Sequence, residues 1–369
     1  MVVEGSRPSC IKDIIGNESP ESRNDFADFQ IPNHRGLESD CTETDPLFRG
    51  QYRKINCPIV ESPVPAEIED TYAEAFRSIY TAVLITAKDR YWLEHAIRET
   101  CGNASSSILC DCEAALDHHL DPSHTPDGRP GAIVQFHVPR FWKDREQRLE
   151  RAVMVRVSQN VLTCPTTACF NVLPSETNWF PLGRKVSYFG DGHQFKTERH
   201  GRNVRVIPIL SGEFVIERRL GWADGLMGGN LWFFGTTEDG ALEAAMRAAD
   251  AASRIPGVIL PFPGGVASSG SKAGSKYKFT IASTYAEYCP TLRSKPGVES
   301  RLPDGIVSVQ EIVINGKDLP TICEATQAAI KASVETPGLL RISAGNYGGR
   351  LGKSFVYLNA EKQPSVSPR

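Results

Sequence analysis

Residues 238–260 read EDGALEAAMRAADAASRIPGVIL, the pattern of a helix, a stop and a strand. Residues 238–255 are rich in alanine and keep helical spacing, so they predict one long helix. Pro256-Gly257 ends this helix, because proline cannot continue a helix and glycine readily adopts the backbone conformation of the turn that follows. The apolar residues 258–260 then predict a buried strand. The residues aligned on the predicted inner face of the helix are Leu242, Ala245, Met246 and Ala249.

The same order occurs a second time toward the C-terminus. Residues 308–314 predict a strand, residues 320–334 a helix, Pro337-Gly338 a stop, and residues 339–342 a further strand. Since the strand-like residues 231–234 precede the first helix, both units run strand, helix, stop, strand. This order is typical of a split β-α-β arrangement.

The first half of the chain carries similar signals. Residues 81–86 and 132–138 predict buried strands, and residues 91–100 and 145–161 predict helices. We therefore predict an α+β fold with two α/β-sandwich lobes, one in each half of the chain. The predicted boundaries are 67–206 for the first lobe, 207–360 for the second, and 361–369 for a C-terminal tail.

The segment before the first lobe has a different composition. Residues 1–66 hold seven Lys/Arg and eleven Asp/Glu, a net charge of −4, whereas the whole chain carries −3. Seven prolines interrupt the segment, and it keeps no helical or strand period. We predict a flexible N-terminal extension, because such a segment buries too little apolar surface to offset the entropy lost on ordering. The alternative is a partner-binding tail anchored by Phe26, Phe29 and Phe48.

Composition and charge argue against several classes of protein. The 369 residues are 40% hydrophobic and 23% charged, as in an ordinary soluble protein. No apolar run is long enough to span a membrane, and the N-terminus lacks the pattern of a secretory signal. A net charge of −3 gives no case for a nucleic-acid or membrane-surface partner. The ten cysteines show no disulfide-framework spacing, so we expect a reduced, cytoplasmic protein.

Two glycine-rich stretches are the strongest indication of a ligand site. One reads PFPGGVASSGSKAGSK at residues 261–276, and the other reads SAGNYGGRLGK at residues 343–353. Glycine lets the backbone approach a ligand closely and point bare amide groups at it. Because each stretch lies near a strand-like run, we expect both at the mouth of an α/β scaffold. They predict binding of an extended, partly anionic small molecule.

Three common site patterns do not match. Gly348 and Gly352 enclose three residues, whereas a phosphate-binding loop needs four between its outer glycines. Cys110-Asp-Cys112 followed by His118-His119 has no zinc-site spacing, and a solvated turn is the commoner interpretation of the two histidines. The sequence has no nucleophile elbow or recognisable triad, although triads are spatial rather than sequential.

Seven segments, in unbroken order, carry a resemblance to one known family. They are IEDTYAEAF (68–76), TPDGRPG (125–131), VLTCPTTACFN (161–171), PFPGG (261–265), SGSKAG (269–274), EIVING (311–316) and SAGNYGG (343–349). Over about residues 67–358 the chain resembles formylmethanofuran:tetrahydromethanopterin formyltransferase. Long matches spread over both lobes are far more specific than any single short motif.

The resemblance implies an acyltransferase of one-carbon metabolism that moves a formyl group between methanofuran and N5 of tetrahydromethanopterin. It implies two ferredoxin-like lobes related by an internal pseudo-repeat, a homotetramer with clefts at subunit contacts, and neither a metal nor a bound prosthetic group. The extension and the near-neutral core depart from the compact, often acidic archaeal pattern of methanogenesis. They are more similar to a bacterial member that serves formaldehyde oxidation, as the formyltransferase subunit of a formyltransferase/hydrolase complex.

Glu311 is the candidate catalytic residue. It lies in the otherwise apolar stretch 309–314, where an ionised carboxylate would be costly. Burial would raise its pKa and let a neutral carboxyl donate a hydrogen bond to the oxygen of a tetrahedral adduct. The resemblance implies the same role. The alternative is a glutamate at a strand edge that faces water or pairs with a lysine.

The remaining candidates are substrate-binding residues. Backbone amides of Gly264, Gly265 and Gly270 fit an oxyanion cradle or a carrier contact, or only tight turns. Lys272 and Arg350, beside Ser271, fit carboxylates on the carriers' acidic tails. Asn346 and Tyr347 fit a flat pterin ring by hydrogen bonding and stacking. Arg129 fits a turn or interface anchor equally well, and Phe170 and Asn171 are similarly ambiguous.

A second functional class stays open at this point. The chain would then be a catalytically silent scaffold subunit of a formyltransferase/hydrolase complex. The presence of Glu311 and of both glycine-rich stretches argues against the silent version.

Overall fold

The computed structural model describes residues 64–362. The predicted extension falls almost entirely outside the described residues, together with Phe26, Phe29 and Phe48, and so does most of the predicted C-terminal tail. By their contacts, all of the described residues belong to one compact unit.

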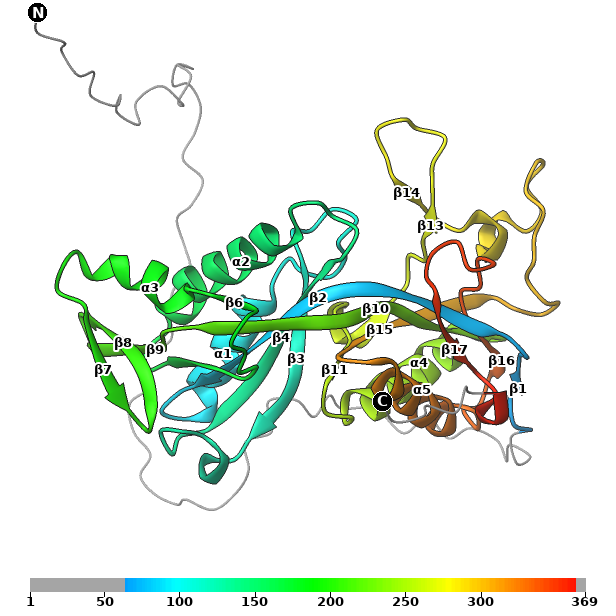
Figure 1. Ribbon diagram of the computed structural model, residues 1–369. Coiled ribbons are helices and arrows are strands. Elements are labelled where there is room, and N and C mark those ends of the chain that lie inside the picture. Colours follow the sequence, from blue (N-terminus) through cyan, green and yellow to red (C-terminus); the bar gives the residue numbers. More distant parts are fainter. Residues whose placement is uncertain (1–63, 363–369) are drawn as a thin grey trace, which may run out of the picture. The chain divides into compact units, whose positions relative to one another are not determined.

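Two long antiparallel strands, β2 (Tyr72–Thr86) and β10 (Leu220–Gly235), form the centre of the large mixed sheet. Their register runs from Trp222 opposite Thr81 to Met227 opposite Phe76, and Figure 1 shows them running together between the two groups of helices. Both are far longer than the predicted segments 81–86 and 231–234. Polar residues in β2 and glycines in β10 interrupt the apolar pattern that the prediction relied on.

The first hydrophobic core lies between one part of this sheet and the helices α1 (Arg90–Cys101) and α2 (Arg145–Arg156). Leu149, Ala152 and Val153 of α2 face inward. The predicted helix to residue 161 ends instead in a π-helical turn, Val157–Val161. The other elements here are β3 (Glu113–Leu120), β4 (Gly131–Pro139), β5 (Ala168–Asn171), β6 (Trp179–Phe180), α3 (Leu182–Ser187), β7 (Phe195–Arg199), β8 (Arg202–Ile209) and β9 (Gly212–Glu217).

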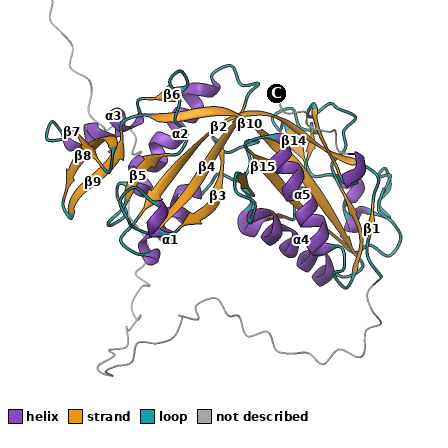
Figure 2. Ribbon diagram, turned by 60° about the horizontal axis from the view of Figure 1, so that its bottom comes forward, coloured by secondary structure: helices purple, strands orange, loops and turns teal. Residues whose placement is uncertain are grey.

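The second core lies between the rest of the sheet and the helices α4 (Glu238–Ser253) and α5 (Leu319–Ser333), which lie side by side (Figure 2). The strand β15 (Ser308–Gly316) pairs antiparallel with β10 and presents Ile312 and Ile314 to these helices. The other strands here are β1 (Glu67–Ile68), β11 (Val258–Ile259), β12 (Val266–Ala267), β16 (Leu339–Ser343) and β17 (Ser354–Tyr357). A separate ribbon pairs β13 (Lys272–Ala273) with β14 (Ala282–Ser283).

The inner face of α4 agrees with the prediction at Ala245 and Ala249 but not at Leu242 and Met246. Leu242 and Met246 are 42% and 45% exposed, and the buried face is made of small residues. The reason is close packing, because a side chain at Gly240 would come within 2.8 Å of the Pro337 backbone oxygen. Only small side chains let the helix approach this turn. The buried residues of α4 are Gly240, Ala241, Ala244, Ala245, Ala248, Ala249 and Ala252.

The result is a mixed α/β fold with five α-helices in the described residues and one large mixed sheet, as predicted at that level. The pseudo-repeat and the lobe boundaries stay predictions. The predicted boundary falls inside β8, where Ile207 belongs to the first core. Ala73 and Ala75, from the start of β2, pack in the second core. The two cores therefore share strands.

Candidate active site

A cavity of about 950 Å³ lies on the face of β10 and β15 opposite the helices α4 and α5. Side chains alternate along a strand, so Ile312 and Ile314 enter the core while Glu311 and Val313 line the cavity. Gly228 and Asn230 of β10 line the same surface. We call these four cavity-lining residues, Gly228, Asn230, Glu311 and Val313, the floor.

Three loops contribute much of the cavity wall. They are residues 106–110, residues 269–272 of the first glycine-rich stretch, and residues 346–351 of the second. The hydroxyl of Tyr347 donates to the Ser271 backbone oxygen at 3.3 Å, so the two glycine-rich stretches contact each other. This confirms the expectation that both lie at one mouth of the scaffold.

Glu311 lies in the floor and is only 8% exposed. Its Oε1 accepts hydrogen bonds from Asn230 Nδ2 at 2.7 Å and from the Trp232 indole Nε1 at 3.0 Å. Burial raises the pKa of Glu311, and these two donors only partly oppose that effect. The strand-edge alternative, a glutamate facing water, does not fit these contacts.

The orientation of the Asn230 amide is fixed by its neighbours. The Gly345 backbone N–H donates to Asn230 Oδ1 at 2.8 Å, so the amide nitrogen is the group that points at Glu311. The Trp232 indole nitrogen can only donate. Oε1 of Glu311 is therefore an acceptor of two N–H groups whatever the charge of the carboxyl.

A second buried glutamate, Glu74 of β2, holds the loop that carries Asn346, Tyr347 and Arg350. Its Oε1 accepts from the backbone N–H groups of Tyr347 at 2.6 Å and Gly349 at 2.7 Å. Its Oε2 accepts from those of Leu351 at 2.9 Å and Gly352 at 3.3 Å. Burial alone would raise the pKa of Glu74, but the four backbone donors outweigh it and lower the pKa.

Glu113 is a third buried carboxyl, and it also lines the cavity. Its Oε1 accepts from the backbone N–H and the hydroxyl of Ser107, both at 2.9 Å, and its Oε2 from Asn315 Nδ2 at 2.6 Å. Burial raises the pKa of Glu113 against these donors. The contacts join the 106–110 wall to the end of β15.

Seven of the predicted site residues line this one cavity. Tyr347 is the most enclosed of those in the second glycine-rich stretch, and burial, followed by nearby Glu311, raises the pKa of its hydroxyl. The Lys272 ammonium lies 5.7 Å from the centre of the Tyr285 ring, which also lines the cavity. The seven are Glu311, Gly270, Ser271, Lys272, Asn346, Tyr347 and Arg350.

Gly264 and Gly265 do not line the cavity. They lie in the 3₁₀ turn Pro263–Gly265 with φ angles of 63° and 77°, in the left-handed region that favours glycine. A side chain at Gly265 would also meet the Ala249 methyl group at 2.9 Å. Both glycines therefore serve the turn, which was the alternative interpretation.

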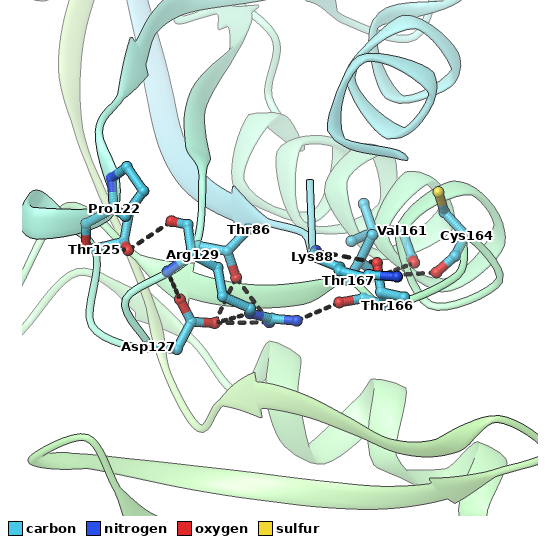
Figure 3. A network of polar contacts seen from close by, with 10 residues as sticks. All are labelled: Thr86, Lys88, Pro122, Thr125, Asp127, Arg129, Val161, Cys164, Thr166 and Thr167. Atoms are coloured by element: carbon cyan, nitrogen blue, oxygen red, sulfur yellow. Dashed lines mark hydrogen bonds and ion pairs between the residues drawn. The ribbon is translucent and has the colours of Figure 1, made fainter. Parts of the chain in front are cut away.

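Arg129 does not line the cavity and belongs to a local network of polar contacts (Figure 3). Its Nε donates to Asp127 Oδ2 at 2.8 Å, its Nη2 to the Thr86 hydroxyl at 3.0 Å, and its Nη1 to the Thr166 backbone oxygen. Thr166 has a positive φ of 68°, and its hydroxyl also accepts from the Lys88 backbone N–H. Arg129 thus anchors a turn rather than lining the cavity.

Phe170 and Asn171 also lie away from the cavity. Phe170 is 1% exposed and packs in an apolar cluster of its own with Leu84 and Val206. The Asn171 side-chain oxygen accepts from the backbone N–H groups of Gly221 at 2.9 Å and Leu173 at 3.2 Å. Both residues belong to β5 and hold the fold together there.

The cysteine–histidine segment forms no metal site. His118 and His119 lie on the strand β3 rather than in a turn, and they pair with Asp117 at 2.8 Å and Glu94 at 2.7 Å. Across residues 64–362 no group of three or more potential ligands is close enough to hold a metal ion. None of the helices in these residues has the length and apolarity needed to cross a membrane.

Sequence reasoning missed Asn230, Trp232, Glu74 and Glu113. Asn230 and Trp232 sit at alternate positions of a strand, but their partner in β15 depends on a register shift between Leu226 and Gly229. Glu74 lies in a polar segment and acts on a loop more than 270 residues later. Neither relation leaves a local pattern in the sequence.

Family models and curated relatives identify the same family for this chain. Residues 64–209 match the family model for formylmethanofuran-tetrahydromethanopterin formyltransferase, and residues 212–360 match the model for its proximal lobe. The formyltransferase of Methanococcoides burtonii is 46% identical over 288 residues, 78% of this chain and 95% of that protein. That of Archaeoglobus fulgidus is 44% identical over 296 residues, 79% and 97% respectively.

Two solved structures extend the comparison. The formyltransferase of Methanosarcina barkeri superimposes with a TM-score of 0.75 at 44% identity, covering 79% of this chain and 97% of that one. A chain of the formyltransferase/hydrolase complex of Methylorubrum extorquens, solved with methylofuran, gives a TM-score of 0.73 at 39% identity, covering 79% and 95%.

Proposed function

Because this chain belongs to the formylmethanofuran–tetrahydromethanopterin formyltransferase family, we propose that its cavity is the place of formyl transfer and Glu311 its catalytic residue. The chain is an enzyme that transfers a formyl group between methanofuran and tetrahydromethanopterin, its two cosubstrates. The observation that carries the catalytic assignment is a buried carboxyl, in the floor of a large cavity, whose Oε1 is occupied by two N–H donors.

The reaction sets two chemical requirements. The acceptor nitrogen, N5 of the pterin in one direction, forms a bond to the formyl carbon while the carbonyl oxygen gains negative charge. The bond from that carbon to the donor nitrogen then breaks, and a proton moves from the attacking nitrogen to the departing one. A site for this reaction needs a hydrogen-bond donor at the oxygen and a group that carries the proton.

A neutral Glu311 meets both requirements. Because Oε1 accepts from Asn230 and Trp232, the proton of the neutral carboxyl lies on Oε2. Burial raises the pKa of Glu311, which favours this neutral form. Oε2–H then donates to the oxygen of the tetrahedral adduct. As the bond from carbon to the donor nitrogen breaks, the carboxyl gives its proton to that nitrogen, and Oε2 takes up the proton that the attacking nitrogen loses.

The walls of the cavity suit the two carriers. Lys272 and Arg350 supply positive charge for carboxylates on their tails. The Nε of Arg350 donates a hydrogen bond to the Tyr347 backbone oxygen at 2.9 Å, and this contact holds the guanidinium at the cavity wall. Asn346 and Tyr347 offer an amide and an aromatic ring to the flat pterin.

The same proposal includes the assembly of the protein. The likeness to a chain of the Methylorubrum extorquens complex supports a bacterial-type formyltransferase subunit of a formyltransferase/hydrolase complex. Formaldehyde oxidation, a homotetrameric arrangement and a cytoplasmic location belong to this proposal.

Two substitutions of Glu311 test the assignment. Glu311→Gln keeps an acceptor for Asn230 and Trp232 and places an N–H donor at the Oε2 position, but it cannot transfer a proton. Glu311→Leu removes both functions. With purified full-length chain, formyl-tetrahydromethanopterin and methanofuran, we expect Glu311→Gln to lower kcat by about 10²- to 10⁴-fold and Glu311→Leu to lower it further.

The matched control is Glu335→Gln, which makes the same Glu-to-Gln replacement at an exposed side chain outside the cavity. This variant should exchange formyl groups at the wild-type rate. Wild-type turnover in Glu311→Gln would reject the catalytic role. Wild-type turnover in Glu311→Leu as well would show that another residue carries the reaction.

A further inference from the structure

We propose that a second cavity, remote from formyl transfer, binds a small molecule carrying several phosphate or carboxylate groups. Its volume is about 480 Å³, and its lining contains five cationic side chains and no carboxylate. None of its lining residues lines the active-site cavity. We call it the basic cavity; its lining residues are Trp179, Pro181, Arg184, Lys196, Arg205, Arg218 and Arg219.

The fold brings these charges together from separate elements of the chain. Lys196 of β7 lies directly opposite Arg205 of β8 in the antiparallel register. Arg218 and Arg219 occupy the short connection from β9 to β10, and α3 supplies Arg184. In Figure 1 these elements lie together at one end of the sheet. Like charges directly opposite one another on neighbouring strands destabilise a sheet unless something compensates them.

Neighbouring cations in the same elements are compensated, whereas those of the basic cavity are not. Lys185 pairs with Glu150 at 2.7 Å, and Arg199 pairs with Glu213 at 2.8 Å. Within residues 64–362, the five cations of the basic cavity make no ion pair with a carboxylate. The structure therefore leaves positive charge concentrated at this one place.

Arg205 gives a second, independent indication of a ligand. Its Nε is buried yet has no hydrogen-bond partner in the described protein. A buried guanidinium N–H without an acceptor is costly, so an acceptor from outside the chain would be stabilising. The Arg219 guanidinium, in contrast, stacks 4.0 Å from the centre of the Trp179 ring and is held in place.

Size and chemistry together define the ligand class. A cavity of this volume falls in the range of small-molecule sites and exceeds what one inorganic ion fills. Guanidinium groups match phosphate and carboxylate oxygens in bidentate geometry, and four arginines with one lysine call for several such groups. A multiply charged phosphate and a multiply charged carboxylate share this chemistry.

The test uses the full-length protein at constant ionic strength, with inorganic tripolyphosphate and citrate as probes. Trp179 reports binding through its fluorescence, with Trp179→Phe to assign the signal, and calorimetry gives the stoichiometry. We expect one saturable site for at least one probe, and binding weaker by about tenfold or more in Lys196→Gln and in Arg205→Gln. The two probes separate phosphate from carboxylate recognition.

The matched controls are Lys185→Gln and Arg199→Gln, which remove the same charge from neighbouring positions that are already paired. They should bind the probes as the wild type does, and all variants should keep wild-type formyl transfer. The proposal is overturned if neither probe saturates, if Lys196→Gln and Arg205→Gln bind normally, or if the controls weaken binding equally. Tighter binding of a short single-stranded oligonucleotide through the same residues would also overturn it.

Discussion

Glu74→Gln should loosen the second glycine-rich loop, because four backbone N–H groups depend on one carboxylate. The two oxygens of Glu74 each accept two of these bonds. Glutamine keeps one oxygen, which still accepts from two of the backbone N–H groups. Its NH₂ group faces the other two N–H groups and cannot accept a hydrogen bond from them. Two bonds to a charged acceptor are lost, at about 1.5–3 kcal/mol each, so we expect a total loss of about 3–6 kcal/mol.

That loss is large beside a total stability of about 5–15 kcal/mol, so the loop is expected to open before the whole protein unfolds. Amide hydrogen exchange at Tyr347, Gly349, Leu351 and Gly352 measures this directly. These amides should be protected in the wild type and should exchange at least about 100-fold faster in the variant. Urea unfolding measures how much of this loss lowers the free energy of unfolding of the whole protein. KM for the carriers should also rise, because Tyr347 and Arg350 lie on the loop.

The effect also has a defined pH dependence. The pKa of Glu74 is lowered in the folded protein, so its stabilising effect is present above its ordinary value of 4.5 and is lost as pH falls through the folded pKa. The difference between wild type and Glu74→Gln should therefore shrink at strongly acidic pH. Glu335→Gln is the control. Unchanged exchange at the four amides in Glu74→Gln would refute the reasoning.

Three further predictions concern Trp232, Arg129 and His137. Trp232→Phe removes one donor to Oε1, so the pKa of Glu311 should rise further and the alkaline limb of the kcat–pH profile should move to higher pH; an unmoved limb would contradict the contact. Arg129→Leu should lower the free energy of unfolding by about 1–3 kcal/mol and leave KM for both carriers unchanged, and a raised KM would restore the ligand interpretation. Burial lowers the pKa of His137 in the folded protein to about 3. The unfolded chain therefore binds a proton at this histidine at a higher pH than the folded protein does, so the free energy of unfolding should fall as pH drops below about 6.5. The slope from His137 is at most about 1.4 kcal/mol per pH unit, and His137→Gln should remove it from the urea-unfolding pH profile.

Four of the five α-helices in the described residues were predicted because each has a local pattern, whereas the short α3 (Leu182–Ser187) was not. The helix expected at residues 91–100 is α1 (Arg90–Cys101), and the one expected at 320–334 is α5 (Leu319–Ser333). On the inner face of α4 the prediction was right for Ala245 and Ala249 and wrong for Leu242 and Met246. Hydrophobicity favours the two larger residues, whereas the space beside Pro337 and Gly338 admits only small side chains.

The candidate site was predictable only in part, and for a physical reason. Glycine density located the loops, but it does not distinguish a glycine that faces a ligand, such as Gly270, from one that a turn requires, such as Gly265. Glu311 stood out because a lone acid in an apolar strand is conspicuous. Asn230 and Glu74 did not, because their roles arise from strand register and from contacts distant in the sequence.

The protonation state of Glu311 at neutral pH is the most direct test of the catalytic account. The infrared difference spectrum between the wild type and Glu311→Leu measures it through the carboxyl C=O stretch. We predict that the wild type contributes a band of a neutral carboxylic acid that the variant lacks. A carboxylate band in its place would contradict the account, because an ionised Glu311 has no proton to donate.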